Sequence, residues 1–515
     1  MMKTILCALA VMALIGVKGQ SLTIDRATTF GGTNSDIATS ISRTNDGGFI
    51  VAGYTQSNNL DVTGAISGED AWILKLSSNG FLQWKKIVGG SGDDRAYDIV
   101  QTQNGDFVFA GTTNSETGDV TNPLGGFDAW MVRLNPNGVV VWSRNLGGSD
   151  DDAFYDVFEA PNGALAAVGE SKSDIAGTLN RGGYDYYLSA LNSNGSTLLQ
   201  RQYGGSADDQ ARAASFSGGS VYIMGTTASD DGNVSDNKGG TDLWLVKTNA
   251  TGNLQFEQSF GGSNNDVGSS LVISSNNLLM AGTTESDDQD LNSNNGGKDF
   301  FLVKFNTSNG QTSWARSYGS DGDEEAYSLI ASSDGGAALI GYSDGNDQDV
   351  PANYGGRDQW LLNVNGSGNV TASQNFGGSA NDEAYDILAV GGNAVVLAGY
   401  SESDDFDLNN NRGNADYWLS RVVLSGAASP LALAAQNEEI SVQAFPNPVV
   451  DQLRLQSSET IEVVRLFDLT GKLVESHTVN STDAIFSLNL PAGIYVMESM
   501  MENGQRLTQS LAVNK

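Results

Sequence analysis

The sequence predicts an all-β protein in two parts: a seven-bladed β-propeller with four antiparallel strands per blade, and a small C-terminal β-sandwich. Three observations lead to this prediction. A unit of roughly 58 residues recurs seven times. Each copy contains four short segments in which apolar and polar residues alternate as they do in strands. No segment shows the 3.6-residue periodicity of an amphipathic helix.

Two independent markers define the repeat. One is the glycine of segments such as FIVAGYT: Gly53, Gly111, Gly169, Gly225, Gly282, Gly341 and Gly399. The other is the aspartate of a GG-x-D-x-W pattern: Asp70, Asp128, Asp185, Asp242, Asp299, Asp358 and Asp416. An aromatic residue stands two positions after each of these aspartates. Because the two series agree in number and spacing, the chain contains seven copies of one structural unit.

The second copy illustrates the four strands expected in each unit. RAYDIVQT (95–102) leads through Asn104-Gly105 to DFVFAGTT (106–113), and a polar loop then leads to DAWMVRL (128–134). Asn137-Gly138 turns that strand into VVVWSRNL (139–146). Asn-Gly between alternating segments is a strong hairpin signal, because both residues tolerate positive φ. Four antiparallel strands per unit are the pattern of a propeller blade.

The two ends of the repeat region predict that the propeller closes into a ring. The last unit has no fourth strand before the alanine-rich stretch that follows it. The segment LTIDRATTF (22–30), followed by Gly31-Gly32, matches the fourth strand of the other units. We therefore expect it to pair with the last blade as that blade's outer strand, which removes an exposed sheet edge. An open solenoid is the alternative.

The chain divides into four predicted regions. Residues 1–19 read as a signal peptide, because Lys3 precedes an apolar run that is too short to span a bilayer. The propeller is expected over 20–425, a linker over 426–439 and the C-terminal module over 440–515. The only cysteine, Cys7, lies in the signal peptide, so disulfides and thiolate metal sites are excluded from the mature protein. We expect a monomer without a transmembrane segment.

Composition narrows the chemistry further. The formal net charge of −34 disfavours nucleic acid and anionic membranes as partners. The sole histidine, His477, lies in the C-terminal module, which removes Ser-His-Asp triads and histidine-ligated metals from the propeller. Glycoside hydrolysis needs only a pair of carboxylates and stays possible.

Two carboxylate series recur in every unit, and we interpret both as structural. The first is the aspartate marker given above. The second comprises Asp36, Asp94, Asp152, Asp209, Asp266, Glu324 and Asp382. A residue repeated seven times is expected to serve the blade, for example by accepting backbone N–H groups in the GGS turn. Catalytic residues should instead occur in only one or two of the seven units.

Acid-rich loops follow the second strand of several units. Pairs of aspartates in them have the i, i+2 spacing of calcium loops: Asp288 and Asp290, Asp347 and Asp349, Asp405 and Asp407. None completes an EF-hand pattern. The sequence allows calcium as a cofactor here, and turn-capping residues on a solvated acidic rim are the alternative.

The first strand of each unit is expected to line the axis, and there the copies differ. Tyrosines, aspartates and one arginine occupy this strand: Tyr97, Asp98, Tyr155, Asp156, Arg212, Tyr327, Tyr385 and Asp386. Tyrosines with carboxylates near an axial mouth suit a glycan or peptide ligand. Packing between blades around a water-filled channel is the alternative.

The C-terminal module carries specific motifs. Their residues are Pro446, Asn447, Pro448, Asp468, Gly471, Lys472, Pro491, Gly493 and Tyr495. With these motifs the module closely resembles the type A sorting domain of the type IX secretion system of Bacteroidota. The resemblance implies that the secretion machinery is a partner and that the protein passes through the outer membrane. It also implies that the domain is then removed and that the protein is released or attached to surface lipopolysaccharide. An ordinary terminal sandwich is the alternative.

The propeller is similar to repeats of secreted Bacteroidota proteins. Its hairpins also resemble the quinoprotein-type propellers in fold, without a quinone-binding signature. Together these observations favour a secreted or cell-surface propeller that acts as a non-catalytic binding or structural module. A carboxylate-dependent glycan-processing enzyme is the alternative.

Overall fold

The computed structural model describes residues 21–425 and 442–514, apart from 66, 176, 292–293, 308–309, 409–410, 446–448, 450–451, 469–471, 489 and 502–505. The predicted signal peptide (1–19) and linker (426–439) lie outside the described residues. The chain folds into two compact units, and the boundary between them falls between Leu433 and Ala434. In the described part, no helix has the length and apolar character needed to cross a membrane.

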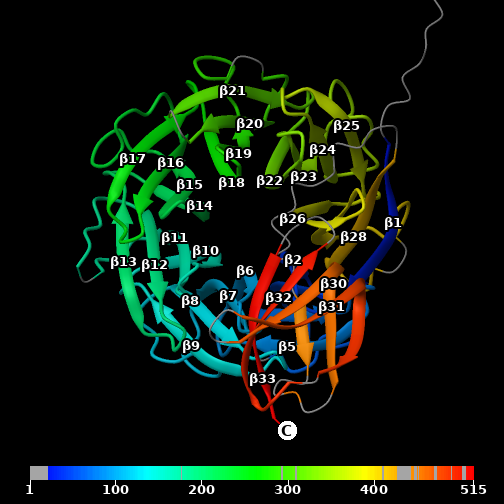
Figure 1. The fold of residues 1–515 in the computed structure, drawn as a ribbon. Coiled ribbons are helices and arrows are strands. Elements are labelled where there is room, and N and C mark those ends of the chain that lie inside the picture. Colours follow the sequence, from blue (N-terminus) through cyan, green and yellow to red (C-terminus); the bar gives the residue numbers. More distant parts are fainter. Residues whose placement is uncertain are drawn as a thin grey trace, which may run out of the picture. The chain divides into compact units, whose positions relative to one another are not determined.

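Seven four-stranded antiparallel sheets form the first unit within the described residues. Figure 1 shows them arranged around a common centre. Contacts between neighbouring inner strands run around the whole ring, including those between β26 and β2. The inner strands are β2 (Asp36–Arg43), β6 (Asp94–Gln101), β10 (Asp152–Glu159), β14 (Asp209–Ser217), β18 (Asp266–Ser274), β22 (Glu324–Ala331) and β26 (Asp382–Gly391). The predicted seven-bladed propeller is confirmed, and a linear stack is excluded.

The remaining strands lie progressively farther from the centre (Figure 1). The second strands are β3 (Phe49–Thr55), β7 (Phe107–Thr113), β11 (Leu165–Ser171), β15 (Ser220–Thr227), β19 (Asn277–Thr284), β23 (Ala337–Ser343) and β27 (Ala394–Ser401). The third strands are β4 (Asp70–Leu76), β8 (Asp128–Leu134), β12 (Asp185–Leu191), β16 (Asp242–Asn249), β20 (Asp299–Asn306), β24 (Asp358–Val364) and β28 (Asp416–Ser425). The outer strands are β5 (Leu82–Val88), β9 (Val140–Leu146), β13 (Thr197–Tyr203), β17 (Leu254–Phe260), β21 (Gln311–Tyr318), β25 (Val370–Phe376) and β1 (Ser21–Phe30).

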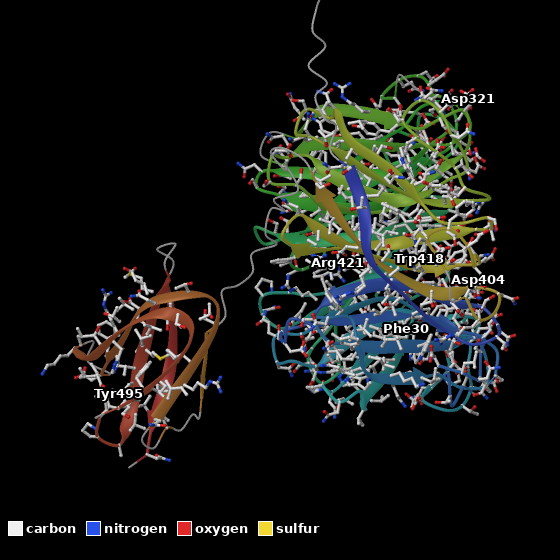
Figure 2. All side chains as sticks on the ribbon, turned by 90° about the vertical axis from the view of Figure 1, so that its right-hand side faces the viewer. Phe30, Asp321, Asp404, Trp418, Arg421 and Tyr495 are labelled. Carbon is white, nitrogen blue, oxygen red and sulfur yellow. The ribbon has the colours of Figure 1, made fainter. Side chains whose placement is uncertain are left out.

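We number the blades by their inner strands, from blade 1 at β2 to blade 7 at β26. The two ends of the propeller carry different loops. At the loop face, each inner strand begins and the acidic loops and GGS turns gather; Asp321 and Asp404 lie there in Figure 2. At the opposite end, the hairpin face, the Asn-Gly turns connect the strands.

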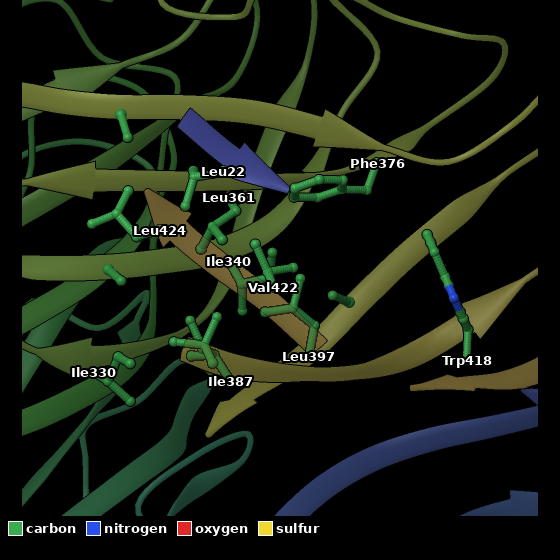
Figure 3. Close-up of a cluster of buried hydrophobic side chains, with 14 of the residues drawn as sticks. Leu22, Ile330, Ile340, Leu361, Phe376, Ile387, Leu397, Trp418, Val422 and Leu424 are labelled. Atoms are coloured by element: carbon green, nitrogen blue, oxygen red, sulfur yellow. The ribbon is translucent and has the colours of Figure 1, made fainter. Parts of the chain in front are cut away.

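The N-terminal strand closes blade 7, as the sequence predicts. β1 pairs antiparallel with β28 along its whole length, from Ser21 opposite Ser425 to Phe30 opposite Tyr417. Leu22 on β1 is 5% exposed and belongs to an apolar cluster built from blades 6 and 7, which Figure 3 shows together with Leu424 and Val422. The strand thus contributes side chains to the core as well as hydrogen bonds to the edge of the sheet.

The marker glycine of each repeat lies opposite a β-bulge in the inner strand. In blade 2, Ala96 pairs with Gly111 and Asp98 with Ala110, so that Tyr97 has no partner in the ladder. A Cβ atom on Gly111 would lie 1.8 Å from the carbonyl oxygen of Arg95. The same shift of register occurs in all seven described inner strands. Glycine recurs there because the bulge brings the two backbones too close for a side chain.

The second carboxylate series caps the turns between blades. Asp94 is buried, and its Oδ2 accepts the N–H of Gly90 at 2.7 Å and the hydroxyl of Ser115 at 2.7 Å. The hydroxyl of Thr113 donates to its other oxygen. Equivalent bonds from a turn N–H occur in the other blades. The structural interpretation of this series is therefore confirmed.

Blade 6 differs from the other blades at three residues of this cap. Glu324 replaces the aspartate, Ser320 the glycine of the turn, and Gly345 the serine of the following loop. The hydroxyl of Ser320 donates to Glu324 at 2.6 Å, as the loop serine does to aspartate elsewhere. A Cβ atom on Gly345 would lie 1.6 Å from that hydroxyl oxygen. In blade 6 the serine hydroxyl therefore comes from the turn instead of the loop, and the longer glutamate side chain still accepts the hydrogen bonds of the cap.

The second unit is also all-β. Its strands are β29 (Val442–Phe445), β30 (Gln452–Phe467), β31 (Leu473–Ser487), β32 (Gly493–Met501) and β33 (Arg506–Val513). Hydrogen bonds join them in one sheet, in which β30 pairs with β29, β31 and β32. Side chains from β30, β32 and β33 form one buried apolar cluster with Val449, Leu488 and Leu490.

Candidate functional site

The bulges of the inner strands position the candidate axial residues. The bulged position is tyrosine in four blades and threonine, arginine or serine in the other three: Thr39, Tyr97, Tyr155, Arg212, Ser269, Tyr327 and Tyr385. A bulged residue is free of the ladder, so its side chain can be re-aimed without disturbing the sheet. The structure brings the predicted tyrosines together in two groups.

The first tyrosine cluster comes from blades 2 to 4. The rings of Tyr97 and Tyr155 lie 5.0 Å apart between centroids, and the guanidinium of Arg212 lies 3.9 Å from the Tyr155 centroid. The Tyr155 hydroxyl donates to Glu170 Oε1 at 2.8 Å. Burial raises the pKa of Tyr155, so its hydroxyl stays protonated and can donate. A cavity of about 150 Å³ lies beside this cluster and is lined by Arg95 and both tyrosines, among others.

The second tyrosine cluster comes from blades 6 and 7. Tyr327 and Tyr385 lie 4.8 Å apart between centroids. Both hydroxyls approach Glu383 Oε2, at 3.4 Å for Tyr327 and 3.1 Å for Tyr385. Arg357 forms an ion pair with Glu383 at 3.0 Å and lies 4.3 Å from the ring centroid of Tyr342. Burial and the charge of Glu383 raise the pKa values of both bulge tyrosines.

A second cavity adjoins this cluster. Its volume is about 130 Å³, and Tyr327, Glu325 and Lys298 are among its lining residues. The Tyr327 hydroxyl lies 3.3 Å from Glu325 Oε2. Burial acts to raise the pKa of Glu325, but the hydrogen bond from Lys298 and its positive charge outweigh burial and hold that pKa below its usual range. Glu325 is therefore an anion near neutral pH.

The sequence interpretation missed three further tyrosines of this region. Tyr54, Tyr342 and Tyr400 stand on the second strands, opposite Ile37, Glu325 and Glu383 in the neighbouring ladder. The signal was present: AGYT, IGYS and AGYS carry tyrosine where the second copy has AGTT. Burial, followed by the charge of Glu69, raises the pKa of Tyr54 to about 12. With these residues, tyrosines occur in five consecutive blades, from blade 6 through blade 7 to blade 3.

The predicted axial aspartates connect neighbouring blades. Asp98 Oδ2 accepts the N–H of Val157 at 3.0 Å, and Asp386 Oδ2 accepts the N–H of Ile41 at 2.9 Å. Asp156 accepts the N–H of Ala214 in the same way at 2.5 Å. Burial raises the pKa of Asp386 to about 7, and burial together with the charge of Asp98 raises that of Asp156. The geometry assigns these carboxylates to packing between blades, the alternative that the sequence left open.

The predicted calcium residues lie in the acidic loops of the loop face. In each pair the first carboxylate accepts the N–H of a turn residue: Asp288 from Ser263 at 2.8 Å, Asp347 from Asp321 at 3.0 Å and Asp405 from Ser379 at 2.8 Å. The second of each pair, Asp290, Asp349 or Asp407, donates its own N–H to a turn glycine carbonyl. Over the described residues, no group of three or more metal-ligating side chains occurs. Calcium binding by these loops stays a prediction.

The sorting-motif residues form local turn contacts in the second unit. Asp468 and Lys472 close a turn, in which the Asp468 N–H donates to the Lys472 carbonyl at 3.0 Å and the Lys472 N–H donates to Asp468 Oδ1 at 3.1 Å. The hydroxyl of the buried Tyr495 donates to the Pro491 carbonyl at 2.9 Å, two residues before Gly493. The predicted residues Pro446, Asn447, Pro448 and Gly471 lie outside the described residues.

Comparison with known families identifies this second unit. Residues 443–514 match the model of the secretion system C-terminal sorting domain. The unit is a type IX sorting domain. This domain directs the protein to export by the type IX secretion system, to the cell surface or beyond it. The expected sorting domain and export are therefore confirmed, whereas removal of the domain and attachment to lipopolysaccharide stay predictions.

Several known proteins are similar to parts of the chain. Over 219 residues it is 24% identical to the regulatory protein FlaEY of Caulobacter vibrioides, which covers 38% of this chain and 22% of that protein. PorZ, a surface component of the type IX secretion system of Porphyromonas gingivalis, aligns over 94% of this chain and 60% of its own, with 10% identity and a TM-score of 0.41. A fungal alcohol oxidase of the AA5 family aligns over 96% and 99%, with 12% identity and a TM-score of 0.44. The chain thus spans about a fifth of the length of the curated relative.

Proposed function

We propose that the exported propeller is a non-catalytic binding module whose two tyrosine clusters hold a glycan. The observation that carries this proposal is the set of tyrosines in five consecutive blades, several with hydroxyls bonded to glutamates, beside two cavities. Aromatic faces can stack on the apolar faces of sugar rings, and nearby carboxylates and guanidinium groups can bind sugar hydroxyls.

The charge arrangement of the second tyrosine cluster supports binding over hydrolysis. A glycosidase needs one carboxyl group with a raised pKa to protonate the leaving oxygen. The two carboxylates closest to Tyr327 are Glu325 and Glu383, and each is ion-paired, with Lys298 and Arg357 respectively. The neighbouring cation lowers the pKa of Glu325. This pair suits a fixed acceptor surface. In the first cluster burial raises the pKa of Glu170, which accepts the Tyr155 hydroxyl, so the hydrolysis screen tests the glycan-processing alternative there.

A glycan array combined with a hydrolysis screen on the full chain tests the proposal. We expect saturable binding of one class of glycan without product formation. Tyr97→Ala and Tyr385→Ala should each weaken that binding about tenfold or more, since each removes a ring of the stack. Tyr354→Ala is the matched control, because Tyr354 is an exposed loop tyrosine that packs on Phe406 instead. Unchanged affinity in both cluster variants, a peptide as the ligand, or hydrolysis would each refute the proposal.

A further inference from the structure

A cavity of about 370 Å³ lies where the ring closes, between blade 7 and blade 1. We call it the seam cavity. It lies toward the hairpin face, because the Asn79-Gly80 turn lines it. The cavities of the tyrosine clusters lie toward the loop face, where Asp151 and Asn265 line them. Its floor is apolar and includes Ile41, Leu76 and Leu419, all of which are largely buried within the core.

The seam cavity lies beside a repeated position at which the closing strand carries a charged residue. Five residues before the first glycine of the turn, five of the six other outer strands carry a large apolar residue, and β25 carries Ala372. The five are Trp84, Trp142, Leu199, Phe256 and Trp314. β1 carries Arg26 there. In blade 1 the indole N–H of Trp84 donates to the Pro136 carbonyl of blade 2 at 3.2 Å, and its ring packs edge-on against Phe107 at 5.8 Å.

Arg26 also donates to the turn of the next blade, but to a carbonyl one residue further along than the indole does. It donates to the carbonyl of Asn79, in the matching turn of blade 1. Phe49, which corresponds to Phe107, therefore lines the cavity instead of contacting an indole ring. At the seam a positively charged side chain thus stands where most other blades have a large apolar one.

The rim of the seam cavity is cationic. Arg26, Arg43 and Arg421 line it, and its lining residues include no aspartate or glutamate. Arg421 forms an ion pair with Asp25 of β1; Figure 2 shows Arg421 nearer the face opposite Asp321. Three guanidinium groups around one apolar cavity stand out in a chain whose net charge is −34.

We propose that the seam cavity binds a small amphipathic anion, with one carboxylate, sulfonate or phosphate group on an apolar body. The apolar floor gives an aliphatic chain or aromatic ring a place away from water. Guanidinium groups bind such anions through charge-assisted, often bidentate hydrogen bonds. This site is independent of the proposed glycan site, because it uses none of the tyrosines and lies at the other face.

Fluorescence of 8-anilinonaphthalene-1-sulfonate with the folded full chain tests the proposal. This probe is an aromatic sulfonate whose emission rises in apolar sites. We expect saturable binding at one probe per chain, and displacement by octanoate. 1-Octanol, which has the same chain length without the charge, should displace the probe at least about tenfold less well, because it makes no charge-assisted bond.

Three variants distinguish the effect of filling the seam cavity from the effect of removing a positive charge from its lining. Arg26→Trp restores the side chain of blades 1, 2 and 5, so it should fill the cavity and abolish probe binding without loss of folding. Arg43→Gln should weaken binding about tenfold while leaving the cavity open. Arg144→Gln removes the same charge from β9, outside the cavity, and should change nothing. Equal competition by octanoate and octanol, or full binding by Arg26→Trp and Arg43→Gln, would overturn the proposal.

Discussion

Closure of the ring by β1 makes a quantitative prediction for Leu22. This side chain is 5% exposed in the apolar cluster of blades 6 and 7 and lies opposite Leu424 in the ladder. Replacing a buried leucine by alanine costs about 2–5 kcal/mol of unfolding free energy. Because Leu22 is the second residue of β1, the strand end can relax, and we expect Leu22→Ala to cost about 2–3 kcal/mol. Thr23→Ala, on the exposed side of the same strand, should cost less than about 0.5 kcal/mol.

Tryptophan fluorescence during guanidinium unfolding measures this difference. All eight tryptophans lie in the propeller, so the signal reports that unit and not the sorting domain. Midpoints at an unchanged slope convert directly into differences of unfolding free energy. Equal midpoints for Leu22→Ala and Thr23→Ala would show that β1 does not contribute to the core, and the account of closure would then be wrong.

Three further predictions concern the carboxylates. Burial raises the pKa values of Asp185 and Asp299 to about 7, so the folded chain holds protons there that the unfolded chain releases above about pH 4. Stability should therefore fall as pH rises through 7, with a thermal midpoint about 5 °C lower at pH 8.5 than at pH 5.5, and a higher midpoint at pH 8.5 would contradict the assignment. Gly345→Ser should cost about 1–3 kcal/mol through its clash with Ser320. Combining it with Ser320→Gly and Glu324→Asp should restore most of that loss, and a neutral single variant would argue against the clash. Equilibrium dialysis of the full chain should show calcium bound weakly, at millimolar levels, if the acidic loops act as the sequence predicts; no bound calcium would end that prediction.

The fold could be predicted because it depends on short sequence patterns, such as turn residues, and on the number of strands in each repeat. Turn chemistry such as Asn137-Gly138 gives the hairpins, and the observed β8 has the bounds expected for DAWMVRL. The predicted strand 139–146 and the observed β9 differ by one residue. Closure of the ring could be predicted by counting strands, because the last unit lacked its fourth strand and the N-terminal segment 22–30 matched that strand without belonging to another unit.

The candidate site was predicted only in part. The bulge tyrosines were found because they break the repeat on the inner strand, where side chains were expected to face the axis. Tyr342 and Tyr400 break the repeat as well, but their role depends on the ladder that places them opposite Glu325 and Glu383. The carboxylate of Asp98 could have bound a ligand, but it accepts the N–H of Val157 in the next blade instead.

The sequence by itself determined the number of blades, the strands within them, the closing strand and the export domain, because each is written in short-range patterns that repeat or match a motif. The tertiary structure alone decided how residues from different blades combine. The pairing of tyrosines across blades, the ion pairs of Glu325 and Glu383, and the seam cavity beside Arg26 all depend on contacts between units that are separate in sequence. A repeat pattern fixes what each blade is, whereas the distances between blades follow from how all seven pack around the axis.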